Sequence, residues 1–284
     1  MPELPEVEIT ARVIGSATAG ATIESALAPG VNALKTFDPP LSAVEGARIS
    51  SVTRRGKLFV VALDNDLVLL IHLMSAGRLQ LFDTRASLRD RTSRLLLRLE
   101  DGRELRLREF GTKQAAWVKV LRREDLDAEE TLAKLGPEAY PDPPPVPELL
   151  ALLDAPRPLH GMLRDQRVIA GIGRSWVDEI LHCAKLSPFK RGSELSADEA
   201  GRLREAMITK LGDAIAHYEQ TIAVPIPDKL PMPLSVHRRN GEPCPRCGDT
   251  LEAVFYEDYV MCYCPNCQTD GKLLKDRRLS RLLK

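Results

Sequence analysis

Four cysteines near the end of the chain have the spacing of a metal site. Cys244 and Cys247 form one C-x-x-C pair, Cys264 and Cys267 form a second, and 16 residues separate the two pairs. Two such turns can present four thiolates as a tetrahedron, the arrangement that zinc takes in structural sites. Because the protein would fill all four positions and leave none for a catalytic water, the sequence predicts one structural zinc ion per chain.

The distribution of cysteines argues against a disulfide framework. Five of the six cysteines fall within the last 41 residues, and the chain opens without a secretory signal, so a reducing compartment is expected. Cys183, in the helix-like run ILHCAKL, is expected to be a buried apolar residue, and Cys262 to be a neighbour of the metal site. The alternative, four unrelated thiols, does not account for their spacing.

A second chemically capable stretch is the opening MPELPEVE. If the initiator Met1 is removed, Pro2 carries a free secondary amine, and an α-amino group titrates near about 8, so part of it is neutral and nucleophilic. Glu3 beside it could donate or accept a proton. A structural alternative remains open at this point, because proline and glutamate are also favoured in the first turn of a helix.

Composition limits the classes of protein to consider. The 284 residues are 44% hydrophobic, enough for about two domains, each with its own core. The formal net charge of zero argues against an overall polyanion binder, so contacts with nucleic acid must be local. No run approaches the roughly 18 apolar residues of a membrane helix, and the acidic start is unlike a targeting signal. We therefore expect a cytoplasmic protein without a membrane partner.

The pattern of hydrophobic residues and turns predicts an α+β fold. A helix over residues 5–17 and alternating runs such as KLFVVAL and LVLLIHL indicate an antiparallel β domain in 1–134. Six prolines in residues 135–148 predict a linker. Apolar spacing of three and four then indicates a helical domain in 149–236, and the cysteine pairs with the β-branched stretch between them indicate a zinc hairpin in 237–284.

The segments PELPEVE, RRGKLFV, HLMSAGRL, REFG, LGPE, DQRVIAGIGRSWVDEIL and NGEPCPRCG occur in this order. Together they resemble the formamidopyrimidine-DNA glycosylase and endonuclease VIII family, over almost the whole chain and including the 16-residue gap between the cysteine pairs. The resemblance implies a β-sandwich domain and a helix-two-turns-helix domain with a zinc finger. It also implies a monomer that works at the nucleoid on damaged double-stranded DNA, whose damaged nucleotide is flipped out.

The resemblance assigns catalytic roles at the start of the chain. Pro2 is expected to attack C1′ of the sugar and form a Schiff base, with Glu3 as the acid and base that opens the ribose ring. Glu6 is added to the catalytic set. Lys57, after a glycine in an expected hairpin, is placed near the phosphate and the elimination step, although an ordinary strand lysine is the alternative.

Three further residues match the family trio that fills the space left by the flipped base. Phe110 is expected to wedge into the base stack, Arg108 to face the orphaned partner base, and Met74 to fill the gap beside them. A long, flexible methionine and a flat phenylalanine suit this task. For Met74, a place in the hydrophobic core is the alternative.

The chain departs from the family pattern near the expected phosphate site. Arg174 stands where the family has an asparagine, and Tyr259 stands where its finger hairpin has an arginine. His160 replaces an expected lysine, and residues 221–244 are shorter than in enzymes with a loop that caps 8-oxoguanine. We expect Arg174 to take over the phosphate contact, with Tyr259 and Arg239 as further DNA-binding residues.

Two functions follow. The chain is expected to be a glycosylase and abasic-site lyase of a divergent branch, and the alternative is a damaged-DNA-binding module that has lost turnover. A zinc-ribbon protein for RNA or protein contacts is a more distant third. Intact Pro2, Glu3 and Lys57 favour the enzyme, because a pure binder has no need of them. A basic tail, residues 272–284, has no assigned role.

Overall fold

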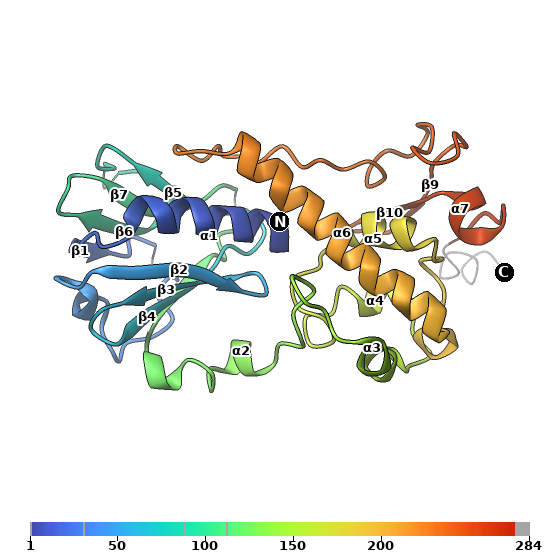
Figure 1. Cartoon of the computed structure of the whole chain (residues 1–284). Helices are drawn as coiled ribbons and strands as arrows, with labels where there is room; N and C mark the ends of the chain where they lie inside the picture. The colour runs from blue at the N-terminus through green and yellow to red at the C-terminus, as the bar shows by residue number, and fades with distance from the viewer. Residues whose placement is uncertain (1, 31, 88, 112, 276–284) are drawn as a thin grey trace. The chain divides into compact units, whose positions relative to one another are not determined.

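The computed structural model describes residues 2–30, 32–87, 89–111 and 113–275. Its contacts divide the chain into two compact units (Figure 1). The first unit combines Met1–Lys134 with Ile215–Pro231, and the second combines Leu135–Ala214 with Met232–Lys284. The domain boundaries expected at 134, 148 and 236 stay predictions, and the final nine residues of the basic tail lie outside the described part.

The first unit contains two antiparallel four-stranded sheets, and the antiparallel β domain preceded by a helix that the sequence predicted is confirmed. The strand order is β1-β6-β7-β5 in one sheet and β2-β3-β4-β8 in the other. The elements are α1 (Leu4–Thr18), β1 (Ile23–Leu27), η1 (Leu41–Val44), β2 (Ile49–Arg55), β3 (Leu58–Leu63), β4 (Leu67–His72), β5 (Gly77–Phe82), β6 (Ser93–Leu99), β7 (Glu104–Glu109), β8 (Trp117–Arg122), η2 (Arg123–Asp125) and α2 (Glu130–Ala133).

Helix α1 packs against β2, and two contacts define its direction. A Cβ on Gly15 would lie 3.2 Å from the carbonyl oxygen of Val52, so the backbones approach closely near the end of the helix. Seven residues earlier, the Glu8 carboxylate pairs with Arg54 at 2.7 Å. The helix therefore runs antiparallel to β2, and its first turn points toward the turn between β2 and β3.

The second unit is mainly helical and ends in a β-hairpin. Its elements are α3 (Val146–Leu153), α4 (Leu159–Met162), α5 (Trp176–Ala184), η3 (Gly192–Glu194), α6 (Ala197–Thr221), β9 (Glu252–Phe255), β10 (Val260–Tyr263) and α7 (Pro265–Thr269). The hairpin between the cysteine pairs was predicted from its β-branched and aromatic residues. Together the two units confirm the α+β class.

Helix α6 is shared by the two units. Its first part packs in the second unit, and from Ile215 onward it belongs to the first. In the described ranges, no helix combines the length and the apolar character needed to cross a membrane.

Candidate functional site

The first turn of α1 orders two buried carboxylates. Glu3 caps the helix in a capping box: its side chain accepts a hydrogen bond from the Glu6 amide, and its own amide donates to Glu6 Oε2 at 2.8 Å. Both side chains are buried, with exposed fractions of 2% for Glu3 and 4% for Glu6. Pro2, directly before them, is half-buried. The sequence-predicted residues Pro2, Glu3 and Glu6 thus lie together at the positive end of one helix dipole.

Tyr218, which the sequence analysis missed, fixes the second oxygen of Glu6. Its hydroxyl donates to Glu6 Oε1 at 2.9 Å. Burial, and then the neighbouring Glu6 charge, raise the pKa of Tyr218 well above its ordinary value, so the hydroxyl stays protonated and remains a donor. Glu6 is therefore held at both oxygens, by a backbone amide on one side and by a phenol on the other.

Lys57 lies at the β2–β3 turn, toward which the first turn of α1 points. The turn needs Gly56, whose φ is 56°, and Lys57 itself is 9% exposed. Burial, and then the positive charge of Lys57, lower the pKa of His72 to about 4. His72 is thus neutral at cellular pH, and its Nδ1 accepts the Met74 amide hydrogen at 3.0 Å.

Met74, Arg108 and Phe110 come to the same end of the β5–β7 strand pair. The turn that carries Met74 closes tightly, because a Cβ on Gly77 would lie 2.4 Å from the Leu73 carbonyl oxygen. The Arg108 guanidinium carbon lies 4.7 Å from the centre of the Phe110 ring. Met74 has a φ of 50° and is half-buried, so it is outside the hydrophobic core that was its alternative place.

The four paired cysteines converge at the base of the hairpin. The sulfur atoms of Cys244, Cys247, Cys264 and Cys267 all lie within 4.8 Å of one another. Four thiol donors at this separation fit a tetrahedral metal ion, and the set suits zinc. Cys262 is not one of these four ligands: it packs beside Cys244 and Cys264, and its sulfur accepts the Arg238 amide hydrogen at 3.2 Å.

Helix α5 supports this cysteine cluster. His182 Nε2 lies 3.2 Å from the sulfur of Cys244. Burial, and then the charge of Arg246, lower the pKa of His182 to about 4, so a neutral ring can donate one hydrogen to a thiolate. Arg246, between the first two cysteines, donates to the His182 carbonyl at 2.8 Å and so ties the knuckle to the end of α5.

An aromatic and arginine cluster lies at the tip of the same hairpin. Tyr259 stacks on Tyr256, with ring centres 4.4 Å apart, and on His160 at 5.8 Å. The guanidinium carbons of Arg164 and Arg174 lie 4.2 and 5.4 Å from the centre of the Tyr259 ring. Arg164 was missed in the sequence, where nothing local distinguishes it from a surface arginine.

Arg174 is held by the hairpin. Its Nη2 lies 2.5 Å from Asp258 Oδ2, and its Nη1 donates to the Asp258 carbonyl at 2.7 Å. Arg239 is held differently: it donates to the Leu234 carbonyl at 2.9 Å and pairs with Glu242. The described side-chain contacts of Arg239 are with its own loop, and none of them is with the Tyr259 cluster.

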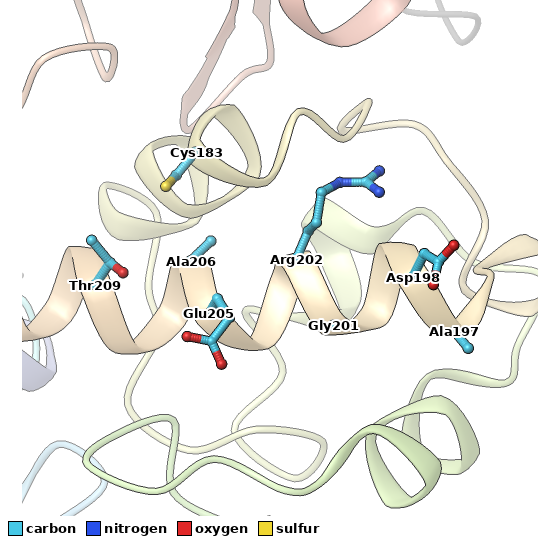
Figure 2. A pocket seen from close by; sticks show the side chains of 8 residues that line it. All are labelled: Cys183, Ala197, Asp198, Gly201, Arg202, Glu205, Ala206 and Thr209. Atoms are coloured by element: carbon cyan, nitrogen blue, oxygen red, sulfur yellow. The ribbon is translucent and has the colours of Figure 1, made fainter.

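A surface hollow of about 700 Å³ lies along α6, lined by residues of α5 and α6 (Figure 2). Cys183 lines it and is partly exposed, so the prediction that this residue is buried was wrong. The helix-like run ILHCAKL predicted a buried residue, but Cys183 lies beside the hollow and keeps part of its surface exposed. None of the predicted site residues lines this hollow.

Two models of protein families match the chain. The formamidopyrimidine-DNA glycosylase N-terminal domain matches residues 1–112, and the formamidopyrimidine-DNA glycosylase H2TH domain matches residues 135–225. The chain belongs to the formamidopyrimidine-DNA glycosylase family. The formamidopyrimidine-DNA glycosylase of Geobacillus kaustophilus is 34% identical over 281 residues, which cover 94% of this chain and 100% of that protein. The resemblance found in the sequence is confirmed.

One further relative and two solved structures are also similar to this chain. An uncharacterized formamidopyrimidine-DNA glycosylase-like protein of Mycobacterium tuberculosis is 48% identical over 123 residues, covering 43% of this chain and 78% of that protein. The crystal structure of the Thermus thermophilus protein has a TM-score of 0.81 and 32% identity, and the match covers 95% of this chain and 100% of that one. The Lactococcus lactis protein, solved in complex with DNA containing N7-benzyl-Fapy-dG, has a TM-score of 0.84 and 25% identity, over 94% of this chain and 100% of that one.

Proposed function

We propose that this protein is a DNA repair glycosylase that excises damaged bases and then cleaves the strand as an abasic-site lyase. The observation that carries the proposal is the first turn of α1, where Pro2 precedes two buried, hydrogen-bonded carboxylates in a chain of this family. The DNA complex of the Lactococcus lactis relative supports damaged double-stranded DNA as the partner. In this proposal the protein works in the cytoplasm, at the nucleoid.

The mechanism begins with the amine of Pro2, freed by removal of Met1, which lies outside the described residues. The neutral amine attacks C1′ of the damaged nucleotide, the base leaves with the electrons of its bond and takes up the proton that the amine gives up, and cleavage of the bond from C1′ to the ring oxygen gives a Schiff base. Glu3 supplies the proton that opens the ribose ring. Glu6, fixed by Tyr218, holds the Glu3 backbone and so the position of Pro2. Lys57 stands near the phosphate that leaves in the elimination step.

The cysteine cluster has a structural role in this proposal. Zinc, when bound by Cys244, Cys247, Cys264 and Cys267, links the two ends of the hairpin and supplies no open position for chemistry. His182 hydrogen bonds to one of the thiolates and keeps the knuckle against α5. A pure DNA-binding module is not favoured, because it does not account for the ordered carboxylates at the start of α1.

The lesion specificity is tested with a panel of duplexes carrying an abasic site, an oxidised pyrimidine, 8-oxoguanine opposite cytosine, or no damage. Residues 221–244 are too short for a loop that caps 8-oxoguanine, so borohydride should trap the protein on abasic sites and oxidised pyrimidines at least about tenfold faster than on 8-oxoguanine. The undamaged duplex is the control. Efficient excision of 8-oxoguanine contradicts the proposed preference, and no trapping on any damaged duplex contradicts the enzyme.

Arg174 and Arg164 form the phosphate contact in this proposal, with Tyr259 as the surface on which they rest. The pair of Arg174 with Asp258 is exposed, the two side chains retaining 42% and 67% of their surface, so exchanging the carboxylate for a phosphate costs little. Arg164 contacts Tyr259 and has no ion pair among the residues that the structure describes. Two permanently charged forks thus compensate for the family arginine that Tyr259 replaces.

Replacing either arginine of this pair by alanine should lower DNA affinity equally for all sequences. Each loss of a phosphate contact should reduce the slope of log K against log salt by about one, and the double variant should reduce it by about two. Fluorescence anisotropy at several salt concentrations measures the slope. Arg85→Ala, which removes an exposed arginine paired with Glu24, is the matched control. Unchanged slopes in both single variants contradict the clamp.

The same replacement of arginine by Tyr259 has a consequence for the product. A phenol carries no positive charge and therefore stabilises a departing phosphate less than the family's guanidinium does. The strand should therefore be cut mainly by β-elimination, and a sequencing gel of a nicked abasic duplex separates this product from the 3′-phosphate of a second elimination. A 3′-phosphate as the main end contradicts this expectation.

A further inference from the structure

The segment that follows α6, residues 222–231, is bound to the edge strand β5. Gln80, which is only 3% exposed, donates from Nε2 to the Ile226 carbonyl at 2.6 Å and to Asp228 Oδ1 at 3.1 Å. Arg78 of the same strand donates from Nε to the Asp228 carbonyl. Asp228 thus receives hydrogen bonds at both its backbone and its side chain, and this defines its position in the fold.

The same carboxylate holds Arg108, which the resemblance to the family places opposite the orphaned base. Arg108 Nη1 lies 3.1 Å from Asp228 Oδ1 and 3.2 Å from Gln80 Oε1, and its Nε lies 3.3 Å from Thr92 Oγ1. Both hydrogens of Nη1 and the hydrogen of Nε are therefore engaged. Of the three side-chain nitrogens of Arg108, only Nη2 has no hydrogen-bond partner among the residues that the structure describes.

Asp228 also offsets a repulsion in the sheet. Arg78 and Arg108 are direct partners in the β5–β7 register, and like charges placed opposite each other destabilise a strand pair. Asp228 accepts from Arg78 at its backbone carbonyl and pairs with Arg108 through its carboxylate, whose negative charge also acts on Arg78. The Asp228 side chain keeps 60% of its surface exposed and Arg108 keeps 20%, so the pair lies at the surface where a duplex can reach it.

We propose that Asp228 determines how strongly this protein discriminates the base opposite the lesion. Two-point recognition of a base requires two parallel N–H groups from different nitrogens of one guanidinium. With Nη1 and Nε engaged, Arg108 offers Nη2 only, so it contacts the orphaned base at a single point. Asp228 is thus a positioning residue, and it weakens the discrimination among bases opposite the lesion. This inference rests on the proposed function and on the expected place of Arg108 opposite the orphaned base.

The hydrogen-bonding groups of the orphaned base determine which base should be favoured when Asp228 is removed. Cytosine presents two adjacent acceptors, N3 and O2, on its Watson–Crick edge, whereas adenine presents one acceptor beside a donor. When the Asp228 carboxylate is absent, Thr92 and Gln80 still orient Arg108, and one hydrogen of Nη1 becomes available beside Nη2. Removing Asp228 should therefore favour cytosine over adenine.

The test measures binding to duplexes with a tetrahydrofuran abasic analogue placed opposite each of the four bases. The ratio of the dissociation constants for adenine and for cytosine should lie within about threefold for the unaltered protein, and it should rise by about tenfold in Asp228→Ala. Asp228→Asn retains an acceptor for Nη1 and should give an intermediate ratio. In the double variant Arg108→Ala with Asp228→Ala, the ratio should return to the starting value, because the gained discrimination passes through Arg108.

Asp38→Ala is the matched control, because it removes an exposed carboxylate bonded to Arg122 in the same unit. A ratio that does not change in Asp228→Ala, or that changes equally in the Arg108→Ala background, overturns the inference. Because binding is measured without turnover, the result is independent of Schiff-base chemistry: failure of borohydride trapping alone contradicts the enzyme but leaves this test valid. Absence of any preference for the abasic duplexes over undamaged DNA overturns both.

Discussion

A protein that retains Met1 is expected to give no covalent complex with abasic DNA under borohydride. Inserting a glutamate between Met1 and Pro2 keeps the methionine in place and turns the nitrogen of Pro2 into an amide, which is not a nucleophile. We expect trapping to fall by at least about a thousandfold, as for the removal of other catalytic nucleophiles. Pro2→Gly should slow trapping, because it replaces the secondary amine by a primary amine and removes the ring that fixes the first residue.

Two comparisons make this result specific. Glu3→Gln should retain more lyase activity on preformed abasic sites than excision of a damaged base, because ring opening and departure of the base need the proton more than the later elimination does. The variant Lys57→Met tests whether the amine of Pro2 or the amine of Lys57 is the nucleophile. If the protein with the inserted glutamate still forms the complex and Lys57→Met does not, then Lys57 is the nucleophile and the assignment to Pro2 is wrong.

Removing the metal should have the second large effect. Strands β9 and β10 have four residues each, and an isolated two-stranded hairpin of this length is not stable in water. Binding of structural zinc supplies on the order of 10 kcal/mol toward folding such a motif. Chelation, or Cys264→Ser, should therefore unfold the hairpin and lower DNA affinity on the order of 100-fold, as measured by anisotropy and by hydrogen exchange across residues 244–267.

Elemental analysis should find one zinc ion per chain. Cys262→Ser and Cys183→Ser serve as controls, since both thiols lie outside the four-sulfur cluster and their replacement should leave the zinc content unchanged. A protein without zinc, or one that loses its metal through Cys262→Ser, would falsify the assignment of the four ligands. Hydrogen exchange in the first unit should stay unchanged throughout.

The sequence predicted those parts of the fold whose causes are local. The helix expected over 5–17 forms at Leu4–Thr18, because proline, the acidic first turn and the apolar spacing all act within a few residues. The hairpin and the cysteine cluster follow from two short motifs. Met74, Arg108 and Phe110 come together because the β5–β7 register aligns their strand ends. Their roles in binding stay predictions.

The contacts that the sequence did not predict join residues far apart in the chain. Tyr218 reaches Glu6 across 212 positions, and Asp228 reaches Arg108 across 120. The residues next to them in the sequence do not distinguish Tyr218 from any other tyrosine in a helix, or Asp228 from any other aspartate in a loop. The partial exposure of Cys183 was missed for a related reason, because periodicity identifies the face of a helix but not how completely another helix covers it.

The division of α6 between the units means that the first unit is discontinuous in the gene. A fragment ending at Lys134 would keep every strand of both sheets, yet Glu6 would lose the phenol that holds one oxygen, and Gln80 would lose the carbonyl of Ile226. Two buried polar atoms, Glu6 Oε1 and Gln80 Nε2, would each lose a hydrogen bond, at a cost of about 1–3 kcal/mol. The contacts of the first turn of α1 are thus completed only after about 220 residues have left the ribosome, so a truncated translation product should lack the bond that fixes Glu6 Oε1 even where its sheets have formed.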